Sequence, residues 1–330
     1  MRRLFLPLSL LLFLGLNLMG PAHAGSRVLL RVSTPAVSDD WHAKMWTVFK
    51  ESLDKQAPGE FDVQIHLNGT LFRQGAEPTA MARGNLEMAS VSAFDLARQV
   101  PDFSILTAGY VIRDPKHQQA VLNGPIGESL YRQASERMGL HVLAPLYLGT
   151  RQLGLRSTRK VQTPADLQGV KLRMPSSKEW LFLGNALGAS AMPLSLGEVY
   201  MGLKTGTIDA EDNPLPTLRA TKFNEVLAQI VLTQHLVDSL FITLADKTWQ
   251  GLSPTQQTKV RDAAQAAARF NNEHRLQEET QLLEAFKKQG LTVTTPDVAA
   301  FRQKVQATYS HSDYARSWSV GLLDRIQAAQ

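Results

Sequence analysis

Two arginines and one asparagine in the middle of the chain have side chains suited to holding a carboxylate. Arg151 and Arg173 each stand beside the end of a predicted strand, and Asn213 directly precedes a proline. A guanidinium can bind a carboxylate through two parallel hydrogen bonds, and an amide can bind a neighbouring hydroxyl. These three residues predict a site for a small organic anion. In the alternative interpretation Arg151 pairs with a local carboxylate such as Asp166, Arg173 is a solvated strand charge and Asn213 is a turn residue.

The sequence around each of these residues indicates how it is positioned. In the run GVKLRMP (169–175), apolar side chains alternate with lysine and arginine, so Arg173 faces away from the apolar side of a strand. The final proline cannot continue the hydrogen-bond ladder and ends that strand. The proline after Asn213 disfavours a helical backbone there. We therefore expect 209–214 to be a loop from which the amide projects.

Patterns typical of catalytic and metal centres are absent from the sequence. The histidines are scattered, and there is no phosphate-binding loop, dinucleotide-binding glycine motif or serine nucleophile elbow. The chain has no cysteine, which excludes disulfides and thiolate metal sites. The acidic pairs at 39–40, 211–212 and 278–279 are adjacent rather than placed across a cleft, and we interpret them as solvated. No catalytic residue, metal or cofactor is predicted.

The N-terminus has the pattern of a cleavable signal peptide, predicted at 1–24. Two arginines follow Met1, an apolar run covers 4–19, and the small residues around His23 form a cleavage signature that ends at Ala24. The apolar run is short for a transmembrane span, although a retained membrane anchor is the alternative. The pattern predicts export to the periplasm.

Composition excludes a strongly charged partner. The chain has 35 Lys and Arg against 30 Asp and Glu, and cleavage after Ala24 would remove two of the arginines. The remaining excess is small and scattered, so no nucleic-acid partner is predicted. A mature chain of about 306 residues is long enough for two domains.

Hydrophobic periodicity predicts an α/β fold. The first part of the mature chain alternates strands and helices, as expected for an open sheet covered by helices. Helices are also predicted after Asp114, after the capping box at Ser195 and twice beyond Asp297. The predicted strands are 27–33, 61–67, 86–91, 141–148 with an edge or bulge at Pro145, 152–157, 169–175, 226–235, 239–245 and 291–295; the early helices are 41–56, 75–83 and 127–138.

The longest predicted element is a helix that begins after Ser253 and ends near Gln289. Ser253, a following proline and Gln256 form a strong start signal, and Gly290 ends the pattern. Such a helix is about 50 Å long, so we expect it to cross two lobes with its polar middle where they meet. The alternative is two helices with a break near 271–272. The expected division is 25–148 plus about 239–278 for lobe I, and 149–238 plus about 279–330 for lobe II.

Several segments in succession resemble a known family. They are GTRQ (149–152), TPADLQGVKLRMP (163–175), SLGEVYMGLKTGTIDAEDNP (195–214) and KFNEV (222–226). Together they are similar to the solute-binding subunits of tripartite ATP-independent periplasmic (TRAP) transporters, in the branch that binds C4-dicarboxylates, sialic acid and sugar acids. The resemblance covers essentially the whole mature chain, and the two blocks within 169–214 are its most specific part.

The resemblance implies a fold and a set of site residues. It implies two α/β lobes joined by crossing strands and a long spine helix, which close on an organic anion. Its hallmark carboxylate-binding arginine matches Arg173, its second arginine matches Arg151, and its asparagine matches Asn213. The sialic-acid branch carries an acidic residue where this chain has Ser92, which argues against sialic acid. Local alignment adds Leu196, Ser33, Gln74, Ser92 and Trp180, the last either as buried core or as a stacking surface for a sugar.

From the residues and the resemblance together we expect a periplasmic solute-binding protein rather than an enzyme. The expected ligand is a small organic acid of the sugar-acid or C4-dicarboxylate type. The expected partners are the small and large integral-membrane subunits of a TRAP permease driven by an ion gradient. The alternatives are a periplasmic enzyme on the same scaffold and a receptor that serves a sensor kinase.

Overall fold

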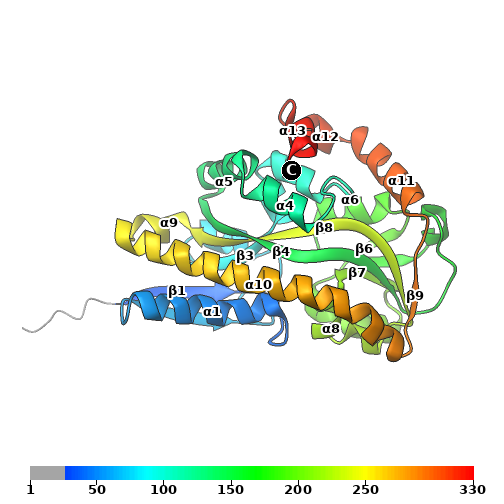
Figure 1. The fold of residues 1–330 in the computed structure, drawn as a ribbon, viewed down its shortest axis with the longest axis horizontal. Helices are drawn as coiled ribbons and strands as arrows, with labels where there is room; N and C mark the ends of the chain where they lie inside the picture. The colour runs from blue at the N-terminus through cyan, green and yellow to red at the C-terminus, as the bar shows by residue number, and fades with distance from the viewer. Residues whose placement is uncertain (1–26) are drawn as a thin grey trace, which may run out of the picture.

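The computed structural model describes residues 27–330 and contains a mixed nine-stranded sheet with helices on its faces (Figure 1). The signal peptide predicted at 1–24 lies outside the described residues. The strand order is β2-β1-β3-β8-β4-β7-β5-β6, with β9 pairing β8. The strands are β1 (Val28–Ser33), β2 (Phe61–His66), β3 (Met88–Ser92), β4 (Leu140–Leu155), β5 (Lys171–Met174), β6 (Ser190–Pro193), β7 (Ala210–Pro214), β8 (Gln229–Ala245) and β9 (Thr292–Thr294).

Helices cover this sheet in both halves of the molecule. The α-helices are α1 (Trp41–Gln56), α2 (Glu77–Ala82), α3 (Ala93–Ala97), α4 (Pro115–Leu122), α5 (Pro125–Met138), α6 (Lys178–Ala186), α7 (Val199–Thr205), α8 (Leu215–Ala220), α9 (Asp246–Gln250), α10 (Pro254–Lys288), α11 (Val298–Ser310), α12 (Asp313–Ser317) and α13 (Leu322–Ala328). The part beyond Asp297, where two helices were predicted, therefore contains three. No helix within 27–330 is both long and apolar enough to cross a membrane.

Two long antiparallel strands, β4 and β8, join the halves of the sheet. On one side β8 pairs with β3, and on the other β4 pairs with β7. We call the half built on β1–β3 lobe I and the half built on β5–β7 lobe II. Each long strand was predicted as two separate strands. In β4 register shifts flank the predicted break, between Tyr147 and Gly149 and between Arg151 and Leu153. At Pro145 β4 pairs with β8 on one side, and among residues 27–330 its other neighbour β7 pairs with it only over Arg151–Leu155, so the edge position predicted for Pro145 is confirmed.

The irregular part of β4 fits closely beneath the spine helix. Gly149 has φ of +132°, a conformation that L-residues with side chains rarely adopt. A Cβ atom there would also overlap Pro214 on β7 and the carboxylate of Glu279 on α10. Glycine therefore lets three elements approach at the point where the chain passes between the lobes.

The spine helix α10 is a single 35-residue helix that begins with the predicted capping box of Ser253 and Gln256. It runs along both lobes (Figure 1). The alternative break near 271–272 is wrong, because the helix is continuous there, and Asn271 and Arg275 of its polar middle are buried and hydrogen-bonded. Asn271 Nδ2 donates to the carbonyl of Tyr147 (3.0 Å), and Arg275 Nε donates to that of Leu148 (2.5 Å). The helix is thus tied to β4 where the lobes meet.

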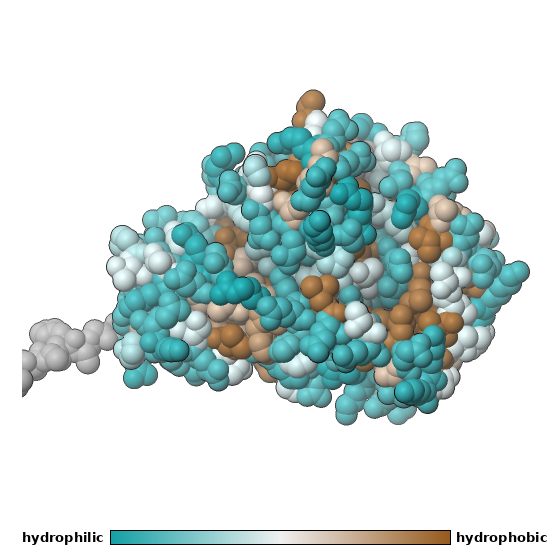
Figure 2. Space-filling view, viewed as in Figure 1, coloured by the Kyte–Doolittle hydropathy of each residue, from teal (hydrophilic) through white to brown (hydrophobic). Residues whose placement is uncertain are grey.

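Each lobe has its own apolar packing. Trp46 of α1 and Ala267 of α10 belong to one buried cluster in lobe I, whereas Phe286 of α10 belongs to a cluster in lobe II. The face seen in Figure 2 is mostly hydrophilic, with hydrophobic side chains in separate groups. The spine helix therefore contributes to both cores, and this packing positions the two walls of the site described next.

Candidate functional site

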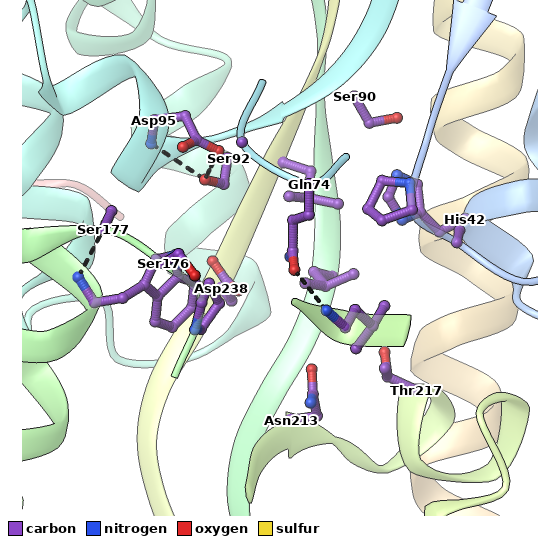
Figure 3. Close-up of a pocket in the computed structure, with 18 of the residues that line it drawn as sticks. His42, Gln74, Ser90, Ser92, Asp95, Ser176, Ser177, Asn213, Thr217 and Asp238 are labelled. Carbon is purple, nitrogen blue, oxygen red and sulfur yellow. Dashed lines mark hydrogen bonds between the residues drawn. The ribbon is translucent and has the colours of Figure 1, made fainter. Parts of the chain in front are cut away.

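A pocket between the lobes is lined by residues from both of them (Figure 3). Arg151 on β4, Arg173 on β5 and Asn213 on β7 all line it. These three strands are neighbours in the sheet, which explains how residues distant in sequence come together. The segment containing Asn213 is not the predicted loop: it forms the central strand β7.

Arg173 is a buried guanidinium without a carboxylate partner. Its side chain is almost inaccessible, at 1% exposure. Nε donates to the carbonyl of Leu194 (2.8 Å) and Nη2 donates to Oε1 of Gln74 (3.1 Å). No salt bridge from Arg173 to a carboxylate is found within 27–330. Burial lowers its pKa to about 10, so the group is still charged at neutral pH. A buried charge without a counterion is costly, and an anionic ligand would supply one.

Arg151 differs because internal acids neutralise it. Its Nη1 pairs with Asp212, and its Nε donates to Oδ2 of Asp238 at 2.7 Å. Burial opposes the charged form, but these two carboxylates raise the pKa of Arg151. The local partner considered from sequence, Asp166, instead caps a short turn through Thr163. Arg151 therefore faces the pocket as part of an ion-paired group.

The adjacent acids Glu211 and Asp212 are completely buried, so the interpretation of this pair as solvated is wrong. Successive residues of a strand point to opposite faces, and a central strand of a covered sheet buries both. Asp212 Oδ2 also lies 2.7 Å from Nε2 of His235. Glu211 Oε2 accepts a hydrogen bond from Asn213 Nδ2 (2.6 Å). Asn213 is thereby held in place beside the two arginines.

Burial raises the pKa of Glu211 to about 8, from an ordinary value of 4.5. The folded protein therefore keeps this proton up to a pH of about 8, whereas the unfolded chain loses it near 4.5. The stabilisation that this bound proton gives to the folded protein is fully present below pH 4.5, and it is lost as the pH rises toward 8. The unfolding free energy of the wild-type protein should therefore fall between about pH 5 and 8. The side chain of Glu211→Gln stays neutral, so in this variant we expect that fall to be smaller by at least about 1 kcal/mol.

The measurement is urea denaturation of both proteins across that pH range. Glu77, whose pKa burial also raises to about 8, should keep some pH dependence in the variant. Parallel stability curves for the two proteins would show that Glu211 does not titrate as described.

Trp180 lines the pocket but has no free ring face. Phe94 stacks on it with ring centroids 3.4 Å apart, and the guanidinium carbon of Arg151 lies 4.3 Å from the ring centroid. Two groups cannot lie over the same face at these distances, so they cover opposite faces. Trp180 therefore has no ring face on which a sugar could stack, and the indole packs against Arg151 instead.

The other predicted residues fall into two groups. Gln74, Ser92 and Leu196 line the pocket. Gln74 Oε1 also accepts from the backbone N–H of Leu196 (3.2 Å). Ser92 Oγ donates to Asp95 Oδ2 (2.8 Å) and, as the N-cap of α3, accepts from the backbone N–H of Asp95 (3.2 Å). Ser33 does not line the pocket: it is the last residue of β1 and is enclosed in the sheet, and Pro35 lines the pocket instead.

Most of the residues that line the pocket were not predicted from sequence, and four of the polar ones show why. Ser90 and Asp238 are polar residues next to apolar ones in β3 and β8, a signal that was available. His42 and Glu77 lie in ordinary helical patterns, and only the packing of α1 and α2 against the sheet brings them to the pocket. Among residues 27–330, no group of three or more His, Asp or Glu residues is arranged to hold a metal ion.

Comparison with known proteins places these features in context. Residues 32–315 match the model of the family described as bacterial extracellular solute-binding protein, family 7. A TRAP periplasmic solute-binding protein from Roseobacter denitrificans, solved with bound 3-deoxy-D-manno-oct-2-ulosonic acid, is 42% identical, with a TM-score of 0.88 over 92% of this chain and 99% of that one.

Two curated relatives are more distant. The sialic acid-binding periplasmic protein SiaP of Vibrio cholerae is 28% identical over 80% of this chain and 81% of its own length. The C4-dicarboxylate-binding periplasmic protein DctP of Rhodobacter capsulatus is 26% identical over 96% of this chain and 95% of its own length.

Proposed function

The chain belongs to family 7 of the bacterial extracellular solute-binding proteins, and we propose that Arg173 holds the carboxylate of an organic acid between the two lobes. It is a TRAP-type solute-binding protein, as its relatives indicate. The observation that carries the proposal is the buried guanidinium of Arg173, which has no counterion among residues 27–330. Asn213 and Arg151 lie at the same pocket and would orient the ligand.

The ligand class is proposed from chemistry that the relatives share. The Roseobacter protein holds a sugar acid, and the two curated relatives are named for sialic acid and C4-dicarboxylates. All of these ligands carry a carboxylate. For this chain we propose an organic acid of the sugar-acid or C4-dicarboxylate type.

Binding would be coupled to closure of the lobes. Gln74 from lobe I accepts hydrogen bonds from Arg173 and from the backbone of Leu196 in lobe II, and Arg98 Nη2 donates to the carbonyl of Ser176 (3.4 Å). A ligand that touches both walls would favour this closed arrangement by differential binding. The proposed division of the chain is 25–148 with about 239–278, and 149–238 with about 279–330.

We propose that the closed form acts in the periplasm and delivers its ligand to the small and large membrane subunits of a TRAP permease. We expect the protein to bind its ligand with micromolar or tighter affinity. A dissociation constant in the micromolar range or below corresponds to about −8 kcal/mol or stronger.

Calorimetric titration of the purified protein tests the proposal. We expect at least one acid among 3-deoxy-D-manno-octulosonate, galactonate, glucuronate and succinate to bind, because each offers a carboxylate to Arg173. The matched control is the uncharged alditol galactitol, which should not bind measurably. If galactitol bound as tightly as galactonate, the carboxylate would not be the group that the protein recognises, and the proposal would be wrong.

A further inference from the structure

The wall of the pocket that lobe I contributes holds three buried polar atoms without a hydrogen-bond partner among residues 27–330. They are Nε2 of His42, Oε1 of Glu77 and Oγ of Ser90. The three residues are 5%, 3% and 8% exposed, and all of them line the pocket that contains Arg173. Buried polar atoms in folded proteins almost always have a partner. A ligand with polar groups along its length would provide a hydrogen-bond partner for each of these three atoms.

Three separate elements hold these atoms in place. His42 is on α1, where the cap residue Asp40 accepts a hydrogen bond from its backbone N–H (2.9 Å). Glu77 begins α2, and its other oxygen accepts from the backbone N–H of Gly75 (2.7 Å). Ser90 lies within β3, paired with β8. Figure 3 shows His42 and Ser90 in the upper right of the pocket, with Asn213 and Thr217 below them. The positions of the three side chains are therefore set by the helices and the strand that carry them.

Within the part of the chain that the structure describes, this wall has no unpaired cation for a second carboxylate. Arg98 is the lobe I residue with a basic guanidinium at the pocket, and it pairs with Asp95 at 3.4 Å. Burial raises the pKa of Glu77 to about 8 and lowers that of His42 to about 4. Both groups are therefore mainly uncharged at neutral pH and suited to hydroxyl groups. A second carboxylate would instead lie beside an acidic side chain.

We propose that the wall formed by His42, Glu77 and Ser90 binds the hydroxyl groups of a polyhydroxylated monocarboxylate and disfavours dicarboxylates. The inference rests on the proposed function, because Arg173 has to hold the carboxylate for the remaining carbons to reach lobe I. It selects the sugar-acid class over the C4-dicarboxylate class.

The first test compares ligands on the wild-type protein. We expect 3-deoxy-D-manno-octulosonate or galactonate to bind at least about tenfold more tightly than succinate and than hexanoate, which has the length of galactonate without its hydroxyls. Succinate or hexanoate binding as tightly as both hydroxy acids would overturn the inference but leave the carboxylate site intact. If neither these acids nor glucuronate binds, the proposed function fails and the inference fails with it.

The second test uses variants of the wall. Ser90→Ala removes one oxygen, and Glu77→Gln keeps the shape while replacing the acid. We expect Ser90→Ala to weaken binding of the hydroxy acid by about tenfold and to leave hexanoate binding unchanged. Glu77→Gln should likewise weaken binding of the hydroxy acid relative to binding of hexanoate. The matched control is Ser157→Ala on the exposed surface, which should change neither affinity.

Melting temperatures of the variants show whether they are folded. An equal loss of affinity for the hydroxy acid and for hexanoate would assign Ser90 a structural role and overturn the inference. Unchanged affinity for the hydroxy acid in both variants would overturn it as well.

Discussion

Replacing Arg173 with alanine is expected to weaken carboxylate binding by about 2–5 kcal/mol, a loss of roughly 30-fold to several thousandfold. Arg173 is 1% exposed, and among residues 27–330 its guanidinium donates hydrogen bonds to neutral oxygens of Leu194 and Gln74. In the variant the carboxylate would enter the pocket without its charged partner, and Arg151 could not replace it because Asp212 and Asp238 already neutralise that side chain. Calorimetric titration with the ligand identified for the wild-type protein measures the loss.

Two further variants sharpen this experiment. Arg173→Lys keeps the charge but loses the two-pronged geometry, so its affinity should lie between those of the wild type and the alanine variant. Arg132→Ala on the exposed side of α5 removes the same charge far from the pocket and should leave the affinity unchanged. If Arg173→Ala bound the ligand as tightly as the wild type does, Arg173 would not be the residue that holds the carboxylate.

Replacing Asp212 with alanine is expected to lower the free energy of unfolding by about 3–5 kcal/mol. Asp212 is completely buried and pairs with both Arg151 and His235. Without it, Arg151 keeps only Asp238 as a charged partner, and the polar atoms that faced Asp212 lose their acceptor in a site from which water is excluded. Urea denaturation at neutral pH, followed by circular dichroism, measures the change.

The control for this variant is an exposed ion pair of similar composition. Asp313 pairs with Arg316 on the surface, with side chains 93% and 66% exposed. Removing it by Asp313→Ala should change stability by about 0–1 kcal/mol, because water screens exposed pairs. If both variants lost the same small amount, the buried group around Arg151 would not be a major source of stability.

The two arginines of the pocket therefore have different roles, although their sequence contexts are similar. Arg151 belongs to a network with Asp212 and Asp238 that holds β4, β7 and β8 together, while Arg173 keeps a charge that only a ligand would balance. A ligand bound between them would therefore meet one guanidinium that lacks a carboxylate partner among residues 27–330, that of Arg173, not two. This difference explains why one variant should act mainly on affinity and the other mainly on stability.

Much of the molecule follows from local sequence signals. The helix over 41–56, the capping boxes at Ser195 and Ser253 and the single spine helix depend on caps, glycines and apolar spacing within a few residues of each other. Arg173 could likewise be singled out, because strand alternation places it opposite the apolar side. Such features are encoded locally and need no knowledge of distant partners.

Other features were decided only by the tertiary structure. Two long strands replaced four predicted ones, because pairing between β4 and β8 continues across bulges that break the local pattern. Burial of Glu211 and Asp212 followed from the central position of β7 in the sheet. The polar wall of lobe I likewise depends on how separate elements pack. Side-chain environment is set by contacts between segments far apart in the chain, and no local pattern records which segments those are.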